Sequence, residues 1–139
     1  MLRALLLRGA LFYNSDMKLL KVAPQLVVPD VVKTAEYYRD ELGFAILGYF
    51  ADPPVYAMVA RDDVEIHFGK GDTDTVQVNE AVRRGLGSDV YIWVDDIDEL
   101  FREFSARNVE IVEGPVKRIY ESTEVVVRDL NGFSIVFGD

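Results

Sequence analysis

Glu65 and His67 stand two residues apart in the segment RDDVEIHFGK, and His67 is the chain's only histidine. Apolar residues at positions 64, 66 and 68 alternate with them, so a strand would place this pair together on its other face. A carboxylate beside an imidazole can form part of a divalent metal site or act as a general acid and base. The same pair can also be an ordinary hydrogen-bonded pair on the polar face of a strand.

A second group of candidates lies in DVYIWV, residues 89–94, where Asp89, Tyr91 and Trp93 alternate with aliphatic residues. If the aliphatic residues pack on the core, the acid and the two aromatic rings face the opposite side of the strand. Such a face suits a flat cationic ligand through stacking, cation–π contacts and charge complementarity. The alternative is that Tyr91 and Trp93 fill the core. Further candidates for a cavity wall, each also consistent with ordinary packing, are Tyr49, Tyr56, Met58 and Tyr120.

Composition and charge narrow the classes of partner. The net charge is −9, of which residues 1–16 carry +1 and the remainder −10, so a nucleic-acid partner is not expected. A cationic ligand is compatible with this charge. The sequence contains no cysteine, which suits a cytoplasmic protein and removes thiolate chemistry. Neither a phosphate-binding glycine motif nor a serine-nucleophile motif is present.

Residues 1–20, MLRALLLRGALFYNSDMKLL, begin like a secretory signal. Arg8 interrupts the apolar run, however, no small-x-small cleavage site follows, and the run is too short to span a membrane. We therefore predict an N-terminal extension, or an upstream start before Met17, with a targeting segment as the alternative. A single domain over residues 21–139 and no membrane association are expected.

The elements that position the candidate residues occur twice in the same order. Asp30 is placed to cap a helix that Gly43 ends, and Asp96 takes the equivalent place 66 residues later, with Glu99 at capping-box spacing. Pro24 indicates either that the first strand is an edge strand or that this residue lies in the strand's first turn. Each half reads strand, helix, strand, strand, strand, which indicates a duplicated unit. The predicted strands are 21–29, 44–50, 54–61, 64–70, 89–94, 109–119, 122–129 and 132–138, with helices within 31–42 and 97–104 and a short helix around 79–84.

The openings VVPD-helix-LGF and WVDD-helix, with the closing VVVRDLNGFSIVF, resemble the vicinal oxygen chelate superfamily of glyoxalases, bleomycin-resistance proteins and dioxygenases. The bleomycin-resistance-like branch is the most similar. The resemblance implies an α+β fold in which two βαβββ modules form a cupped mixed sheet around a cleft, with the helices outside. Module 1 would cover about residues 21–70 and module 2 about 89–138, with a linker at 71–88.

The resemblance also implies positions for metal ligands, because the family's catalysts hold a divalent metal with His and Glu. The matching positions are Ala23, Asp89, Val136 and one residue near Glu65 and His67. Ala23 and Val136 have no ligating side chain, and catalytic metal sites usually need three protein ligands. We therefore expect neither a metal nor another cofactor. If a metal binds, its ligands would be Glu65, His67 and Asp89.

The predicted function is non-catalytic binding or sequestration of a small aromatic or cationic compound, as in drug-resistance proteins. The resemblance also implies a homodimer, which would have two equivalent clefts under two-fold symmetry. The ligand-binding residues would be the candidates described above: Glu65, His67, Asp89, Tyr91 and Trp93, together with Tyr49, Tyr56, Met58 and Tyr120. The alternative is a metal-dependent glyoxalase-like lyase or isomerase, or a dioxygenase. A third possibility is a structural or regulatory protein whose own side chains fill the cavity.

Overall fold

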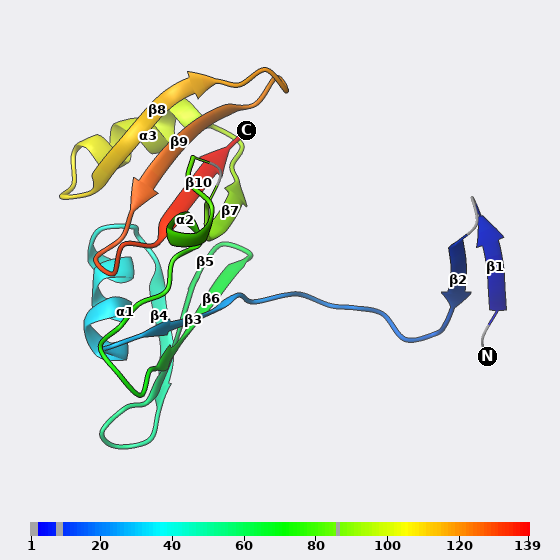
Figure 1. Ribbon diagram of the computed structural model, residues 1–139, viewed down its shortest axis with the longest axis horizontal. Coiled ribbons are helices and arrows are strands. Elements are labelled where there is room, and N and C mark those ends of the chain that lie inside the picture. Colours follow the sequence, from blue (N-terminus) through cyan, green and yellow to red (C-terminus); the bar gives the residue numbers. More distant parts are fainter. Residues whose placement is uncertain (1–2, 8–9, 86) are drawn as a thin grey trace.

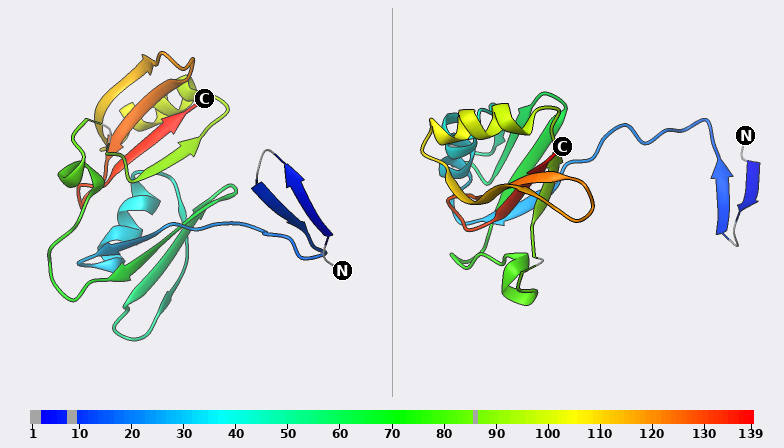
Figure 2. Two further views of the ribbon diagram at one scale, coloured as in Figure 1. Left: turned by 45° about the vertical axis from the view of Figure 1, so that its right-hand side comes forward. Right: turned by 90° about the horizontal axis from the view of Figure 1, so that it is seen from above.

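The computed structural model describes residues 3–7, 10–85 and 87–139, and it contains two mixed four-stranded sheets. Each sheet belongs to one half of the chain, and each is covered on one face by a helix (Figures 1 and 2). The fold is α+β and consists of two βαβββ modules, as the sequence predicts.

Module 1 has the strand order β3-β6-β5-β4, with β3 at the edge, as Pro24 indicates. β3 starts four residues later than predicted, because Pro24 cannot donate a backbone hydrogen bond; its carbonyl instead accepts from His67 N at 2.9 Å. β3 pairs with β6 in parallel, and the other pairs are antiparallel. The elements are β3 (Gln25–Val28), α1 (Val31–Asp40), β4 (Ala45–Phe50), β5 (Tyr56–Arg61) and β6 (Val64–Lys70).

Module 2 repeats this arrangement with the order β7-β10-β9-β8. Its edge strand β7 is parallel to β10, and the remaining pairs are antiparallel. The elements are β7 (Val90–Trp93), α3 (Ile97–Ser105), β8 (Glu110–Lys117), β9 (Thr123–Arg128) and β10 (Ser134–Gly138).

Both predicted helix caps are present. The carboxylates of Asp30 and Asp96 each accept a hydrogen bond from the backbone N–H three residues later, at 3.0 Å. Gly43, three residues after the last residue of α1, has φ +77°, a conformation that glycine adopts without strain. Only half of the predicted capping box forms, because the Glu99 side chain pairs with Arg102 instead of returning to the cap.

The two modules share one hydrophobic core, to which the helices and the covered face of each sheet contribute. Polar contacts fasten module 1 to module 2 around this core. The Tyr38 hydroxyl of α1 donates to buried Asp129 at 2.7 Å, and Arg61 of β5 forms a two-pronged ion pair with Glu103 of α3 at 2.8 Å. These contacts fix how the two sheets are oriented, and therefore the direction of the face that each helix leaves uncovered.

The predicted N-terminal extension contains a hairpin of β1 (Arg3–Leu7) and β2 (Ala10–Asn14). An extended segment separates the hairpin from the two modules (Figure 1); residues 1, 2, 8 and 9 of the extension lie outside the described residues. In the linker, α2 (Asn79–Val82) corresponds to the predicted short helix. Among the described residues, no helix has the length and apolar character needed to cross a membrane.

Candidate functional site

The sequence-predicted candidates divide between the two sheets, mostly on the faces that the helices leave uncovered. Strand alternation explains this: in β7, Ile92 is buried in the core, whereas Trp93 is 74% exposed. Trp93 therefore does not fill the core. Tyr91 is half-buried, and its ring centroid lies 4.8 Å from that of Trp93.

The uncovered face of module 2 is hollowed into a cleft of about 410 Å³, which we call the Glu124 cleft. Its floor comes from β9 and β10, and the end of the linker forms one wall. A second recess, the Trp93 recess, adjoins it at Tyr91 and Tyr120. The Glu124 cleft is lined by Glu80, Gly85, Gly87, Ser88, Tyr91, Val112, Glu113, Arg118, Tyr120, Glu124, Val126, Arg128, Ser134 and Val136. The Trp93 recess is lined by Tyr91, Trp93, Tyr120, Glu121, Ser122 and Asp139.

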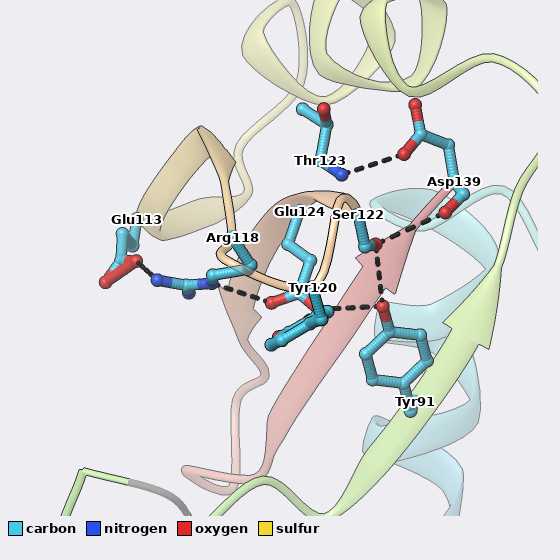
Figure 3. Close-up of polar contacts among 8 residues, drawn as sticks. All are labelled: Tyr91, Glu113, Arg118, Tyr120, Ser122, Thr123, Glu124 and Asp139. Atoms are coloured by element: carbon cyan, nitrogen blue, oxygen red, sulfur yellow. Dashed lines mark hydrogen bonds and ion pairs between the residues drawn. The ribbon is translucent and has the colours of Figure 1, made fainter.

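Glu124 is the centre of a hydrogen-bond network in this cleft (Figure 3), although only 3% of the residue is exposed. The hydroxyls of Tyr91 and Tyr120 both donate to its Oε2, each at 2.7 Å. Arg118 Nε donates to its Oε1 at 2.9 Å, and Arg118 Nη1 lies 2.6 Å from Glu113. Every oxygen of the buried carboxylate therefore has a partner.

These contacts keep Glu124 ionised and both tyrosines protonated. Burial alone would raise the pKa of the Glu124 carboxyl, but the hydrogen bonds from the two phenols and the guanidinium together hold that pKa below its usual value. The pKa of Tyr120 is raised by its hydrogen bond to Glu124 and by burial. The pKa of Tyr91 is raised mainly by burial.

Gly138 makes room for this arrangement. It lies directly opposite Glu124 in the β9–β10 ladder. A Cβ at this position would collide with the Tyr91 hydroxyl and press on Ser122 Oγ. The absence of a side chain at Gly138 therefore allows the Tyr91 hydroxyl to reach Glu124.

The candidates of module 1 form a separate chain of polar contacts, which we call the His67 network. The Tyr56 hydroxyl lies 2.7 Å from His67 Nδ1, and His67 Nε2 lies 2.6 Å from Glu65. Lys21 donates to the other Glu65 oxygen at 2.8 Å. Hydrogen bonds from Lys21 and then His67 lower the pKa of Glu65. Met58 lies opposite His67 on the same uncovered face.

Two predicted site residues take other places. Tyr49 lies opposite Ala57 on the face that α1 covers, because a bulge between Ile46 and Gly48 shifts the alternation of β4. Asp89 is not among the residues that line the cleft. Its two oxygens accept backbone hydrogen bonds from Asn79 and Ser134, both at 2.9 Å, so that it joins the linker to β10.

The family model of the Glyoxalase/Bleomycin resistance protein/Dioxygenase superfamily matches residues 18–137. The chain belongs to this superfamily. A search of curated proteins finds no match to the chain.

Solved structures of the superfamily's fold are similar over most of this chain. A bleomycin-binding protein from bleomycin-producing Streptomyces verticillus, complexed with copper(II)-bleomycin, is 22% identical, with a TM-score of 0.66 over 87% of this chain and 96% of that one. A bleomycin resistance determinant encoded on the transposon Tn5 is 20% identical, with a TM-score of 0.66 over 86% and 96%. TioX from Micromonospora sp. ML1 is 20% identical, with a TM-score of 0.66 over 85% and 97%.

The residues that could hold this superfamily's divalent metal do not fit a metal site. Both ring nitrogens of His67 and both oxygens of Glu65 are engaged within the His67 network. Asp89 lies in the other module, and backbone N–H groups occupy its oxygens. Across the part of the chain that the structure describes, no three His, Asp or Glu side chains are grouped to hold a metal ion.

The sequence analysis missed the two residues at the centre of the cleft, Glu124 and Arg118. A signal for Glu124 was present: in TEVVVR it alternates with Val125 and Val127, which predicts that its carboxylate leaves the core face. Arg118 follows β8 in a loop, and no periodic pattern indicates its direction.

Proposed function

We propose that this chain is a non-catalytic binding protein that sequesters a small aromatic or cationic compound in the Glu124 cleft and the adjoining Trp93 recess. The observation that carries the proposal is the open aromatic wall of Tyr91, Trp93 and Tyr120. Trp93 and Tyr120 are 74% and 61% exposed, although large aromatic side chains are normally buried. Such rings provide stacking surfaces for a flat ligand.

Charge favours a cation at this wall. The acidic side chains that line the two hollows outnumber the basic ones, and the whole chain carries −9. Negative potential together with aromatic faces attracts organic cations. The acids are Glu80, Glu113, Glu121, Glu124 and Asp139, and the bases are Arg118 and Arg128.

The structural relatives support the same class of function. Two of them are bleomycin-binding proteins complexed with bleomycin or copper(II)-bleomycin, and another is a bleomycin resistance determinant. A role in resistance to a toxic compound is part of the proposal, since sequestration needs no bond chemistry and no metal. A cytoplasmic location also belongs to it and rests on the cysteine-free sequence.

A homodimer completes the proposal. Module 1 leaves apolar side chains on its uncovered face, among them Val27 and Phe50, at 59% and 61% exposed. Exposed apolar surface of this kind marks association sites. The uncovered face of one copy would cover the Glu124 cleft of the other, giving two equivalent clefts under two-fold symmetry. Sedimentation equilibrium should give the mass of two chains. A monomeric mass at all concentrations would contradict the dimer and leave the cleft proposal standing.

The binding proposal is tested by thermal unfolding with a panel of aromatic cations, including benzamidinium and proflavine. We expect a saturable rise in Tm for at least one of them, because a ligand that binds only the folded state stabilises it by about 2.7 kcal/mol at 100 times its Kd. Trp93→Ala should weaken binding roughly 3- to 30-fold, and Trp93→Phe should weaken it less, since it retains an aromatic face.

Two results would overturn the proposal. One is that no aromatic cation shifts the Tm of the wild-type protein. The other is stoichiometric, tightly held divalent metal in protein purified without chelator, lost when Glu65, His67 and Asp89 are replaced. The second result would establish the metalloenzyme alternative.

A further inference from the structure

Glu124 determines where the protons of the two neighbouring phenols point. A tyrosine hydroxyl has one proton to donate, and an ionised carboxylate can only accept. Tyr91 and Tyr120 both lie 2.7 Å from Glu124 Oε2, so each phenol keeps its proton and donates its O–H to that oxygen. The oxygens of both hydroxyls are left with lone pairs only.

The remaining neighbours do not reverse this polarity. Ser122 Oγ lies 3.1 Å from the Tyr91 hydroxyl and 3.2 Å from the backbone oxygen of Asp139. Because the Tyr91 O–H points to Glu124, Ser122 can only donate in its contact with Tyr91. The Tyr91 oxygen therefore acts as an acceptor whichever neighbour receives the Ser122 proton.

Arg118, the cation beside Glu124, directs two of its nitrogens toward protein carboxylates. Arg118 donates through Nε to Glu124 and places Nη1 2.6 Å from Glu113. It neutralises Glu124 from the side away from the phenols. The two phenol oxygens at the aromatic wall are therefore hydrogen-bond acceptors next to π faces.

We propose that Glu124 is a positioning residue that fixes the hydrogen-bond polarity of the cleft, and that the cleft consequently selects cations with N–H donors, such as amidinium and primary ammonium groups, over cations without any. This inference rests on the proposed binding function and narrows its ligand class. It assigns Glu124 an indirect role: its oxygens are occupied, so the ligand meets the two phenol oxygens and not the carboxylate.

Two aromatic cations of equal charge test the inference. Benzamidinium carries N–H donors, whereas benzyltrimethylammonium carries none. Their Kd values are measured with the full chain by following protein NMR shifts. Net hydrogen-bond contributions of about 1 kcal/mol each predict that benzamidinium binds roughly 5- to 30-fold more tightly. Cation–π attraction acts on both compounds, so the ratio isolates the donors.

Glu124→Gln supplies the decisive variant. With Arg118 still donating to the amide oxygen, the amide nitrogen faces the phenols as a donor, and their protons turn toward the cleft. The preference for benzamidinium should fall to about one. Glu113→Gln is the matched control: it removes the same charge beside Arg118 but touches neither phenol. It should lower both affinities while keeping their ratio.

The outcomes separate the two proposals. If neither cation binds the wild-type protein, the binding function itself is overturned. If both bind equally well, or if Glu124→Gln keeps the wild-type ratio, the cleft still binds cations but the polarity inference is wrong. Should Glu124→Gln fail to fold, the double variant Tyr91→Phe/Tyr120→Phe removes the acceptors directly. It must lose the preference while still binding benzyltrimethylammonium.

Discussion

At the scale of residues, the side chains with the most evident chemistry are occupied within the protein. His67 is held on both ring nitrogens and Glu124 on both oxygens. A polar network whose hydrogen bonds are all satisfied makes the groups around it rigid, whereas polar groups without partners could bind a ligand or a metal directly. The functional consequence of such a network therefore lies in how it orients the members that line a cleft, which in module 2 are the phenol oxygens of Tyr91 and Tyr120.

Asp129 offers a test of how much a satisfied buried carboxylate contributes to stability. Burial raises its pKa, opposed by hydrogen bonds from Tyr38 and from backbone N–H groups. Tyr38→Phe removes the 2.7 Å bond and leaves Oδ2 without that donor. We expect the free energy of unfolding in urea to fall by about 2–3 kcal/mol, because a buried charged group loses its partner.

Tyr37→Phe is the control for that substitution. The Tyr37 hydroxyl reaches only a backbone carbonyl, at 3.5 Å, so its loss should cost less than about 1 kcal/mol at neutral pH. If the two variants lost the same free energy of unfolding, the Tyr38–Asp129 hydrogen bond would contribute no more to stability than the weak Tyr37 contact.

At the scale of elements, local patterns in the sequence were sufficient for most of the fold. The signals that predict strands and helices act within a few residues of the chain, and the structure confirms them. They are the period-2 and helical alternations, the caps at Asp30 and Asp96, and the glycine after the first helix. The duplication then placed the strands in two modules. For Trp93 in DVYIWV the sequence left two positions open, and the structure has the exposed one.

The site was less predictable because its contacts join distant parts of the chain. The bulge in β4 that turns Tyr49 toward α1 depends on pairing with β5, which no local pattern shows. The sequence indicated that the Asp89 carboxylate would be available to a ligand. In the structure it instead accepts hydrogen bonds from backbone N–H groups of the linker and β10. Glu124 was identifiable as leaving the core face, but its partners on β7 and in the loop at Arg118 and Tyr120 were not.

At the scale of the whole molecule, the junction of the two modules depends on α1 and the turn between β9 and β10. Tyr37 and Tyr38 of α1 reach Arg128 and Asp129, and Asn131 donates to Thr34 at 3.0 Å. Both phenols lose solvent on folding. Burial, followed by the charge of Asp129, raises the pKa of Tyr37 to about 12 and that of Tyr38 well above its usual value.

These shifts predict that the protein loses stability at alkaline pH. A tyrosine whose pKa is raised on folding stabilises the native state fully below its unfolded pKa of about 10, and this contribution is lost as pH rises through the folded pKa. Between pH 10 and 12 the native state thus binds more protons than the unfolded one. Each such group lowers the free energy of unfolding by up to about 1.4 kcal/mol per pH unit.

Urea unfolding at a series of pH values measures this slope, and Tyr37→Phe separates the phenol from the lysines that titrate in the same range. The variant should lie within about 1 kcal/mol of the wild-type protein near pH 8 and unfold with a shallower alkaline slope between pH 10 and about 12, because it lacks one of the two junction hydroxyls that can ionise. Parallel alkaline slopes for the wild-type protein and Tyr37→Phe would contradict this prediction, because they would mean that the junction tolerates an ionised Tyr37 phenol without loss of stability.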